Sequence, residues 1–498
     1  MKDVLLFTDV NGIAGWGRYG GSYKVATELR KAGFTVQTID VFGEWTVDEL
    51  KLLIDKFVDK NTLYVGFSNS LMVKQPTDKD YPTACVGTNI EPISHAYAQM
   101  FSQPDSIMWD LFKYIKNKGT KIVVGGAKAG YSQSFEEVDY WVVGEGDVSA
   151  VTLAQSFKTG KEFKTVDTKL LLETDYPYLD CEHSEIIWDK SDLLFPREAL
   201  PIEFSRGCPF RCSFCRAPNI GRKRGTRSVR HEVLREQLFR NYENFGTVDY
   251  MVSDSLTNET PEKIINLHKA ITSLPFKLEL SAHFRLDLLS KNKFERELIE
   301  EMGVKVAFFG IETFHTEASK IIGKNFTREK AIENLNFLKE GWKNKVRIRA
   351  SFIVGLPAEP EKSIWETFKW CTSKDCPLDG FSFYPLSVGD PDRFGLKTSL
   401  FDASPEKFGI RKLRYRVPAK FWEWETDQMT YSRALNICKE MAKELTEHNP
   451  ISETFLGRIV NLGYSLEDII NRKYDSKEFG PRRRKLIEAY KHNLIHGE

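Results

Sequence analysis

The sequence of 498 residues has almost no net charge, no long hydrophobic run and few cysteines. Its 71 Lys and Arg residues are balanced by 70 Asp and Glu residues, which argues against a protein that coats nucleic acid. No stretch approaches the ~18 apolar residues of a membrane span, and the first residues do not form a signal-peptide pattern. We therefore expect a cytoplasmic protein without a membrane partner, for which nucleic acid is a disfavoured partner.

The 8 cysteines are unevenly placed, since three of them lie between positions 208 and 215. Such clustering favours metal binding in a reducing compartment over a disulfide framework. Internal repeats and low-complexity tracts are lacking as well, which argues against a solenoid or a fibrous protein. At roughly 150 residues per domain, the length indicates about three domains.

The first 157 residues alternate short apolar segments with helical patterns, which predicts a doubly wound, Rossmann-like parallel sheet in an α/β protein. The expected strands are 4–9, 35–40, 62–68, 121–125 and 138–143, and the expected helices are 21–31, 47–58, 107–117 and 148–157. The proline-rich stretch 71–105 interrupts this pattern and is interpreted as a long surface excursion that could serve as a lid.

Residues 158–199 show weak periodicity and are expected to form a linker. A second alternating series covers 200–397 and suits a partial β/α barrel of six strands, with its chemistry at the C-terminal ends of the strands. Its expected strands are 202–205, 248–253, 277–283, 304–311, 345–354 and 380–384, and its expected helices lie near 229–241, 261–273, 294–302, 328–340 and 364–372. Residues 398–498 are expected to form a mainly helical C-terminal region, with helices at 429–447 and 486–494.

The strongest local signal is a C-x3-C-x2-C loop formed by Cys208, Cys212 and Cys215, directly after the first strand of the second series. Three thiolates this close can surround one soft metal centre. A structural zinc site normally has a fourth protein ligand, and no further Cys or His follows nearby. A four-iron cluster held by three cysteines instead leaves one iron open to a substrate. A zinc site or free buried thiols form the alternative.

This loop resembles that of the radical S-adenosylmethionine (SAM) superfamily, and the resemblance extends over about 200–387. Gly310-Ile311-Glu312 and the segment from Phe352 to Glu359 resemble further segments of the family. The resemblance implies SAM contacts from Phe214, Asp254, Arg285, Glu312, Arg349 and Gly355. For the charged residues among them, a structural ion pair is the alternative.

The resemblance implies that the three cysteines bind a 4Fe-4S cluster whose open iron binds SAM. Reductive cleavage of SAM would give methionine and a 5′-deoxyadenosyl radical, which abstracts a hydrogen atom from an unactivated carbon. The protein would orient the reactants and exclude water. An electron donor such as flavodoxin or ferredoxin is implied, and the substrate is a small molecule or a peptide.

Two interpretations compete for the N-terminal domain, and the first is a dinucleotide site. Gly15, Gly17 and Gly20 form a G-x-G-x-x-G pattern, and Asp40 follows 20 residues later at the end of an expected strand. However, five residues separate the first expected strand from Gly15, whereas the dinucleotide fingerprint requires a tight turn.

The second interpretation is a resemblance to the cobalamin-binding domains that precede some radical SAM barrels, and it rests on the segments around Gly125 and Gly144. Glycines and polar residues at strand ends would form the rim that approaches the macrocycle: Thr8, Asn11, Gly12, Ser68, Asn69, Ser70, Gly125, Gly126, Gly144 and Gly146. Asn11 stands where many such domains have a cobalt-binding histidine, so we expect no histidine below the cobalt. A domain that is empty or binds substrate is the alternative.

Three further features each have two interpretations. The basic residues between Arg216 and Arg230 bind an anionic partner or form a solvated loop. His283 is a proton donor in the barrel or a satisfied core residue. The distant Cys371, Cys376 and Cys438 fit buried, inert thiols better than a second cluster.

Together these patterns predict a cobalamin-dependent radical SAM methyltransferase that acts on an unactivated carbon. One SAM would methylate cobalamin and a second would generate the radical. The first alternative is a cobalamin-independent radical SAM enzyme with a degenerate N-terminal domain. The second is a non-catalytic metal-binding module with a structural zinc.

Metal analysis separates the cluster from the zinc module. Anaerobically purified protein should contain iron and sulfide, and the reduced protein should give the EPR spectrum of an iron–sulfur cluster, because three thiolates leave too few ligands for a structural zinc. Cys212→Ala should lose the iron. Zinc without iron, and a Cys212→Ala protein that is altered only in stability, would instead support the binding module.

Overall fold

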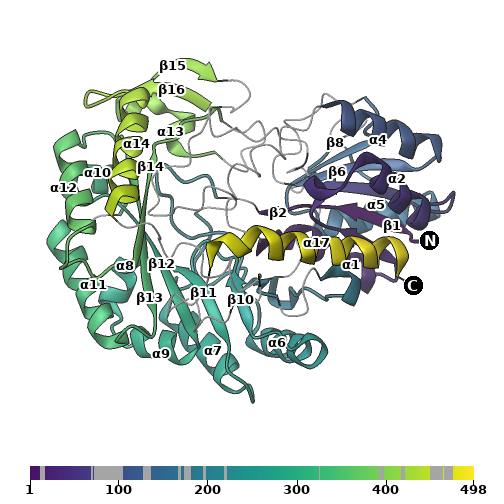
Figure 1. Cartoon of the computed structure of the whole chain (residues 1–498), viewed down its shortest axis with the longest axis horizontal. Coiled ribbons are helices and arrows are strands. Elements are labelled where there is room, and N and C mark those ends of the chain that lie inside the picture. Colours follow the sequence, from purple (N-terminus) through teal and green to yellow (C-terminus); the bar gives the residue numbers. More distant parts are fainter. Residues whose placement is uncertain are drawn as a thin grey trace.

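The computed structural model describes residues 1–11, 17–68, 71, 105–126, 136–165, 170–172, 181–193, 198–217, 221–324, 326–391, 398–416, 421–448, 462, 464 and 475–497. An N-terminal α/β unit lies beside a larger barrel-like unit, and the last helix runs along the first unit (Figure 1). The expected surface excursion falls almost entirely outside the described residues. None of the described helices is both long and apolar enough to cross a bilayer.

The N-terminal unit is built on six parallel strands in the order β4-β1-β5-β6-β7-β8, which confirms the predicted doubly wound sheet. The order reverses at β1, and such switch points are where open α/β sheets bind ligands. The strands are β1 (Val4–Phe7), β4 (Val36–Ile39), β5 (Tyr64–Ser68), β6 (Lys121–Gly126), β7 (Tyr140–Val143) and β8 (Leu170–Leu172). β8 lies inside the expected linker, so the sheet continues beyond the predicted boundary at residue 157.

Helices cover both faces of this sheet because its strands are apolar on both sides. α1 (Gly20–Lys31) and α5 (Asp147–Thr159) pack together on one face, and α2 (Val47–Phe57) and α4 (Asp105–Asn117) pack on the other. α2 begins at a capping box in which Thr46 and Glu49 satisfy each other's backbone amides. A short hairpin of β2 (Val10–Asn11) and β3 (Gly17–Arg18) stands between β1 and α1.

The second unit is an open barrel of six parallel strands in the order β14-β13-β12-β11-β10-β9, as predicted. The strands are β9 (Leu200–Ile202), β10 (Asp249–Val252), β11 (Glu279–Phe284), β12 (Val304–Glu312), β13 (Arg347–Val354) and β14 (Gly380–Pro385). The outer helices are α6 (His231–Phe245), α7 (Pro261–Thr272), α8 (Leu286–Lys291), α9 (Glu295–Glu301), α10 (Thr316–Ile321), α11 (Arg328–Trp342) and α12 (Glu361–Cys371).

Strand alternation separates the barrel's packed outer face from its interior. Ala282, Phe309 and Ala350 are buried against the helices as part of the main core. His283 is paired with Phe308, and Phe308 with Arg349, so these three side chains lie on the interior face at one level. The barrel interior is therefore a polar and aromatic surface, whereas the outer face is apolar.

The C-terminal region is less purely helical than expected. It includes an antiparallel hairpin of β15 (Arg411–Arg416) and β16 (Phe421–Glu425), beside α13 (Leu400–Ala403) and α14 (Tyr431–His448). Trp424 of this hairpin donates a hydrogen bond from Nε1 to the Leu386 carbonyl at 2.8 Å and is fully buried. The hairpin thus closes over the end of β14.

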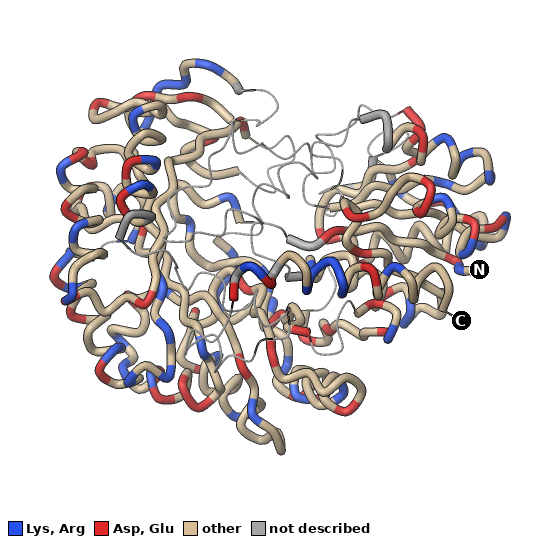
Figure 2. Tube along the Cα trace, viewed as in Figure 1, with Lys and Arg blue, Asp and Glu red and all other residues tan. Residues whose placement is uncertain are grey.

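The last helix, α17 (Phe479–His496), returns to the N-terminal unit. Tyr490 and Leu494 belong to the same core as Trp45 of that unit, and the Asp40 amide donates a hydrogen bond to Tyr490 Oη at 3.1 Å. The basic run that begins at Arg482 lies in this helix, where Arg483 pairs with Glu44. Charges of both signs are interspersed along the chain (Figure 2).

The docking of α17 is testable at Tyr490. Tyr490→Ala should lower the free energy of unfolding by about 3–5 kcal/mol, because it removes a buried ring packed on Trp45. Tyr490→Phe should cost only about 1 kcal/mol, because it removes only the acceptor for the Asp40 amide. Urea unfolding followed by circular dichroism gives both values. Tyr242→Ala is the control, because Tyr242 stacks on Phe276 at the surface. Equal costs for Tyr490→Ala and Tyr242→Ala would contradict the docking of α17.

Candidate active site

The cysteine loop begins where β9 ends, and a buried ion pair secures its start. The Asp254 carboxylate accepts hydrogen bonds from the Phe204 amide at 2.7 Å and from Ser205 Oγ at 2.6 Å. Lys263 Nζ lies 2.9 Å from the same carboxylate, and both side chains are almost fully buried. Asp254, which the resemblance assigns to SAM, is therefore engaged in holding the loop, and a SAM contact from it stays a prediction.

The far part of the loop is anchored to other elements of the barrel unit. Ser213 Oγ donates to the Ile321 carbonyl at 2.7 Å, and the Ser213 carbonyl accepts from the Phe401 amide at 3.0 Å. Arg216 makes a bidentate ion pair with the buried Asp402, with both distances at 2.6 Å. These contacts fix the loop between α10 and α13, so the cysteines are held by tertiary structure on both sides.

The three thiols are reduced, half-buried and close enough to influence one another electrostatically. Burial raises the pKa of both Cys208 and Cys215, so cationic iron is what would keep them as thiolates. Within the described ranges, no three His, Cys, Asp or Glu side chains are spaced to hold a single metal ion. Sulfurs on different corners of an iron–sulfur cube lie farther apart than the ligands of one ion.

Arg285 lies directly against the cysteine loop. Its guanidinium stacks on Phe210 at 3.9 Å from the ring centroid, and Nη1 approaches Cys212 Sγ at 3.5 Å. Asp287 orients it through two hydrogen bonds of 2.9 and 3.1 Å. The positive charge therefore stands beside the sulfur that would carry negative charge, as an anionic cluster requires.

Glu312 ends β12 with a left-handed backbone, φ +72°, which is rare for a residue with a side chain. It accepts a hydrogen bond from Ser351 Oγ at 3.2 Å, and burial raises its pKa although Lys324 and Arg285 lower it. Its neighbour Thr313 donates a hydrogen bond from Oγ1 to Glu359 at 2.8 Å. The segments after β12 and β13, which both resemble family motifs, are thus joined by side chains.

Gly355 and Phe214 are two further predicted SAM contacts near the ends of the barrel strands. Gly355 has φ +93°, and a Cβ on it would lie 2.2 Å from the Trp424 ring, so only glycine fits there. Phe214 is partly buried against the main core. The SAM contacts predicted for Phe214, Gly355 and Glu312 stay predictions, although Glu312 ends β12, Gly355 directly follows β13 and Phe214 lies in the cysteine loop.

The interior row of the barrel contains His283, Phe308 and Arg349. The His283 ring meets the Phe308 ring edge-on at 4.9 Å, and the Arg349 guanidinium lies 6.0 Å from the same ring. His283 is exposed to the barrel interior, and its ring makes no hydrogen bond within the described chain. Burial by the surrounding barrel lowers its pKa. The position of His283 on the interior face favours the proton-donor interpretation over that of a satisfied core residue.

The predicted rim of the N-terminal unit lies at the C-terminal ends of its strands. Gly126 and Gly144 adopt φ values of +138° and +129°, and the Gly144 amide donates to the Gly126 carbonyl at 3.3 Å. Among the described residues, a Cβ on Gly125 would meet only Val142, at 3.8 Å. Thr8 is fully buried, and its Oγ1 has no hydrogen-bond partner among the described residues; Ser68 ends β5. Asn11 lies in β2, whereas Gly12, Asn69 and Ser70 fall outside the described residues.

The dinucleotide interpretation finds no support in this geometry. Asp40 is fully buried and bonded to Arg18 at 2.9 Å and to Tyr23 at 2.5 Å, so it is not available to a ribose. The β2–β3 hairpin also stands between β1 and α1, whereas the fingerprint requires the strand to turn directly into the helix.

A group of charged contacts that no sequence pattern indicates connects the two units. Arg206 and Arg227 both pair with Glu145 of the N-terminal unit, and Arg206 also contacts Asp147. Arg216 and Arg222 likewise have carboxylate partners, Asp402 and Glu259. Sequence offered no pairing signal, because the partners are far apart in the chain. Most arginines of the predicted basic loop are therefore internal, and Lys223, Arg224 and Arg230 are exposed.

Comparison with known proteins identifies the class of domain that contains the cysteine loop. Residues 202–371 match the model of the Radical SAM superfamily. This domain match implies a 4Fe-4S cluster and SAM as cofactors. The three clustered, reduced thiols beside Arg285 fit such a cluster, since they provide anionic sulfur ligands next to a fixed positive charge.

Relatives in sequence carry related names. The chain is 24% identical over 302 residues to a protein of Pyrococcus horikoshii named as an uncharacterized methyltransferase, and the match covers 56% of this chain and 64% of that protein. It is 25% identical over 378 residues to a protein of Methanocaldococcus jannaschii named as a methylthiotransferase, covering 68% of this chain and 80% of that one. The match thus spans slightly less than two thirds of the first relative.

Two solved structures share the whole architecture. The cobalamin-dependent SAM radical enzyme OxsB, solved with aqua-cobalamin bound, aligns with a TM-score of 0.64 at 15% identity, over 99% of this chain and 83% of that one. The radical SAM methyltransferase TsrM of Kitasatospora setae, solved with cobalamin and a 4Fe-4S cluster, aligns at 0.61 and 12% identity, over 98% and 100%. At these identities the likeness establishes the fold of both units.

The buried Glu359 behind the site makes stability depend on pH. Burial raises its pKa to about 8, although Thr313 and Ser363 donate hydrogen bonds to it. The folded protein therefore keeps a proton that the unfolded chain releases above pH ~4.5, so this contribution to stability falls as pH rises towards 8. Between pH 6 and 8 the loss is about 2–3 kcal/mol.

Glu359→Gln should remove that dependence, since the amide stays neutral. Denaturant unfolding at pH 6 and pH 8 measures the difference, and the variant should gain stability over the wild type at pH 8. Parallel pH profiles for the two proteins would show that Glu359 has an ordinary pKa.

Proposed function

We propose that this chain is a cobalamin-dependent radical SAM methyltransferase that methylates an unactivated carbon of a small molecule or a peptide. One observation carries the proposal: the cysteine loop after β9 meets the glycine-rich rim after β7, through direct contacts between Arg206 and Glu145. The cluster site and the cobalamin site can act on one substrate only if both face the space in which that substrate is bound. The fold shared with OxsB and TsrM, whose structures contain cobalamin, supports the same assignment.

The chain's own residues have separate tasks in this proposal. Cys208, Cys212 and Cys215 hold three corners of the cluster, and Arg285 balances its charge. Gly125, Gly126 and Gly144 provide backbone without side chains where a flat macrocycle would lie. When bound, the cluster supplies the electron that cleaves SAM into methionine and a 5′-deoxyadenosyl radical, and cobalamin supplies the methyl group.

The barrel interior would receive the substrate. His283 offers an unpaired imidazole there, and Phe308 and Tyr384 add aromatic surface. The apolar core between the strands and the outer helices holds this row in place around the substrate. An imidazole with a lowered pKa is neutral at pH 7, so it can accept a proton from the substrate.

An anionic one-electron donor, such as flavodoxin or ferredoxin, would approach the cysteine loop from outside. Lys223, Arg224 and Arg230 remain exposed next to the loop, and Arg224 lies 5.0 Å from the Phe210 ring. Positive charge beside an electron-entry point would steer such a donor.

Anaerobic reconstitution tests the proposed function. With SAM and a reductant, the wild-type protein should form 5′-deoxyadenosine, and titration with hydroxocobalamin should shift the corrinoid spectrum. Deoxyadenosine without any corrinoid binding would favour a cobalamin-independent radical SAM enzyme. Absence of deoxyadenosine in reconstituted protein would contradict both.

Gly125→Leu tests the rim separately from the cluster. The added side chain would project from the end of β6 towards the proposed macrocycle, so corrinoid affinity should fall about tenfold, or about 1.4 kcal/mol, while iron content is unchanged. Lys121→Leu, at the opposite end of the same strand, is the matched control and should bind corrinoid normally. Equal loss in both variants would show that the strand, and not the rim, determines binding.

A further inference from the structure

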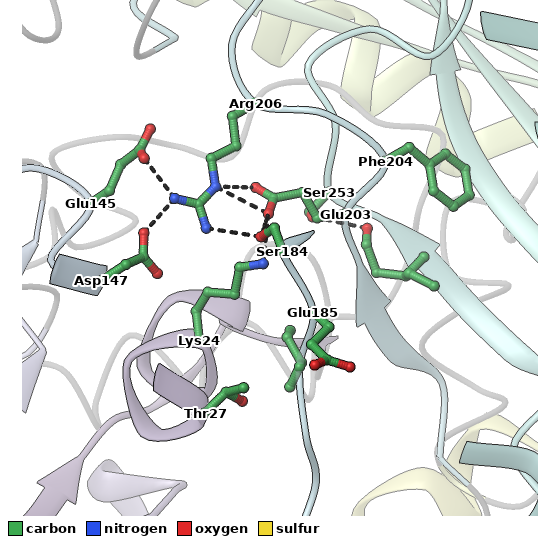
Figure 3. A network of polar contacts seen from close by, with 12 residues as sticks. Lys24, Thr27, Glu145, Asp147, Ser184, Glu185, Glu203, Phe204, Arg206 and Ser253 are labelled. Atoms are coloured by element: carbon green, nitrogen blue, oxygen red, sulfur yellow. Dashed lines mark hydrogen bonds and ion pairs between the residues drawn. The ribbon is translucent and has the colours of Figure 1, made fainter. Parts of the chain in front are cut away.

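Arg206 joins the two units through side-chain contacts that converge from three segments (Figure 3). Its Nη1 lies 2.6 Å from Glu145 Oε2 and also contacts Asp147. Its Nε donates to Glu203 at 2.9 and 3.1 Å, and its Nη2 lies 3.4 Å from Ser184 Oγ. One guanidinium therefore binds three carboxylates, which uses the planar fork that arginine has and lysine lacks.

The surrounding charges are balanced. Lys24 Nζ lies 3.0 Å from Glu203, and Arg227 Nη2 lies 2.7 and 2.6 Å from the two oxygens of Glu145. Three cations thus face three carboxylates in a largely buried junction. Burial by itself raises the pKa of Glu203, but the charges of Lys24 and Arg206 more than offset this and lower it to about 2. Glu203 is therefore ionised at neutral pH, whereas burial raises the pKa of Asp147 although the charge of Arg206 opposes this.

Both ends of this junction belong to proposed cofactor sites. Arg206 precedes Cys208 by two residues, and its backbone is fixed, because its amide donates to the Arg227 carbonyl at 3.0 Å and its carbonyl accepts from Arg222 at 2.7 Å. Glu145 lies between the rim glycines Gly144 and Gly146, and Asp147 begins α5. A shift of either loop would therefore have to move the other or break a buried ion pair, which is costly.

We propose that Arg206 is a positioning residue that sets the distance and orientation between the cysteine loop and the glycine-rich rim. The inference rests on the proposed function, since it concerns the alignment of the two cofactors and the substrate between them. Without Arg206 each cofactor is still bound by its own loop, but the two are no longer held at one separation. SAM cleavage then continues while methyl transfer fails.

Arg206→Met tests this role, and Lys24→Met is its matched control. Lys24 also forms a buried ion pair between the two units, through Glu203, but it contacts neither Glu145 nor Asp147. Arg206→Met should keep full iron content and corrinoid binding. Its ratio of methylated product to 5′-deoxyadenosine should fall by about 10²-fold, the scale of a misplacement near 1 Å. Lys24→Met should keep the wild-type ratio, and Arg206→Lys should recover part of it.

A second measurement does not depend on turnover. Pulsed EPR on the reduced cluster and cob(II)alamin should give one narrow distance distribution in the wild type and in Lys24→Met, and a broad or shifted one in Arg206→Met. Equal broadening in both variants, or none in either, would overturn the positioning role.

Hydrogen exchange on cofactor-free protein separates this inference from the proposed function. Residues 144–147 and 205–208 should exchange faster in Arg206→Met than in Lys24→Met, whether or not corrinoid binds. If the wild type binds no corrinoid, the proposed function fails and this readout still reports the coupling of the two loops. If exchange in both segments is unchanged by Arg206→Met, the coupling itself is contradicted.

Discussion

Parallel strand direction is the constraint on which this structure depends. In each sheet all strands end at the same edge, so the loops that follow them gather there. The structure places the end of β7 against the loop after β9, and β3 lies beside β9. Two units that could each bind a cofactor at their own edge thereby present those edges to each other.

Burial makes that junction specific. Tyr23, from α1 of the first unit, belongs to the main core of the barrel, together with Ile186 and Trp188. Beside this core, Arg18 pairs with Asp40 and with Glu198, which precedes β9, and Arg206 pairs with Glu145. The apolar contacts favour the association of the two units. The buried ion pairs disfavour any other arrangement of the units, because each shift would leave a buried charge unpaired. The C-terminal region also contacts the N-terminal unit, because α17 packs on that unit's core.

Much of the fold was predictable from periodicity. Apolar strands and amphipathic helices alternate in both units, and all eleven expected strands of the two sheets exist with shifted ends. The prediction failed where the signal is weak or distant. β8 has three residues and follows a stretch with little pattern, and the β15–β16 hairpin has charged residues in both strands. α17 was expected as a helix, but its partner Trp45 lies more than 400 residues away in the sequence.

The sequence by itself determined the chemistry that this protein can hold. Cys208, Cys212 and Cys215 are adjacent in the chain, so short-range spacing is enough to define a ligand set. Glycines at strand ends are likewise visible in the sequence. Only the tertiary structure decided which residues serve those sites. It placed Asp254 and Asp40 in buried ion pairs, put His283 in the barrel interior, and brought Arg206 to Glu145. The reason is physical: ion pairing and burial depend on distance in space, and no local pattern records which distant charges will meet.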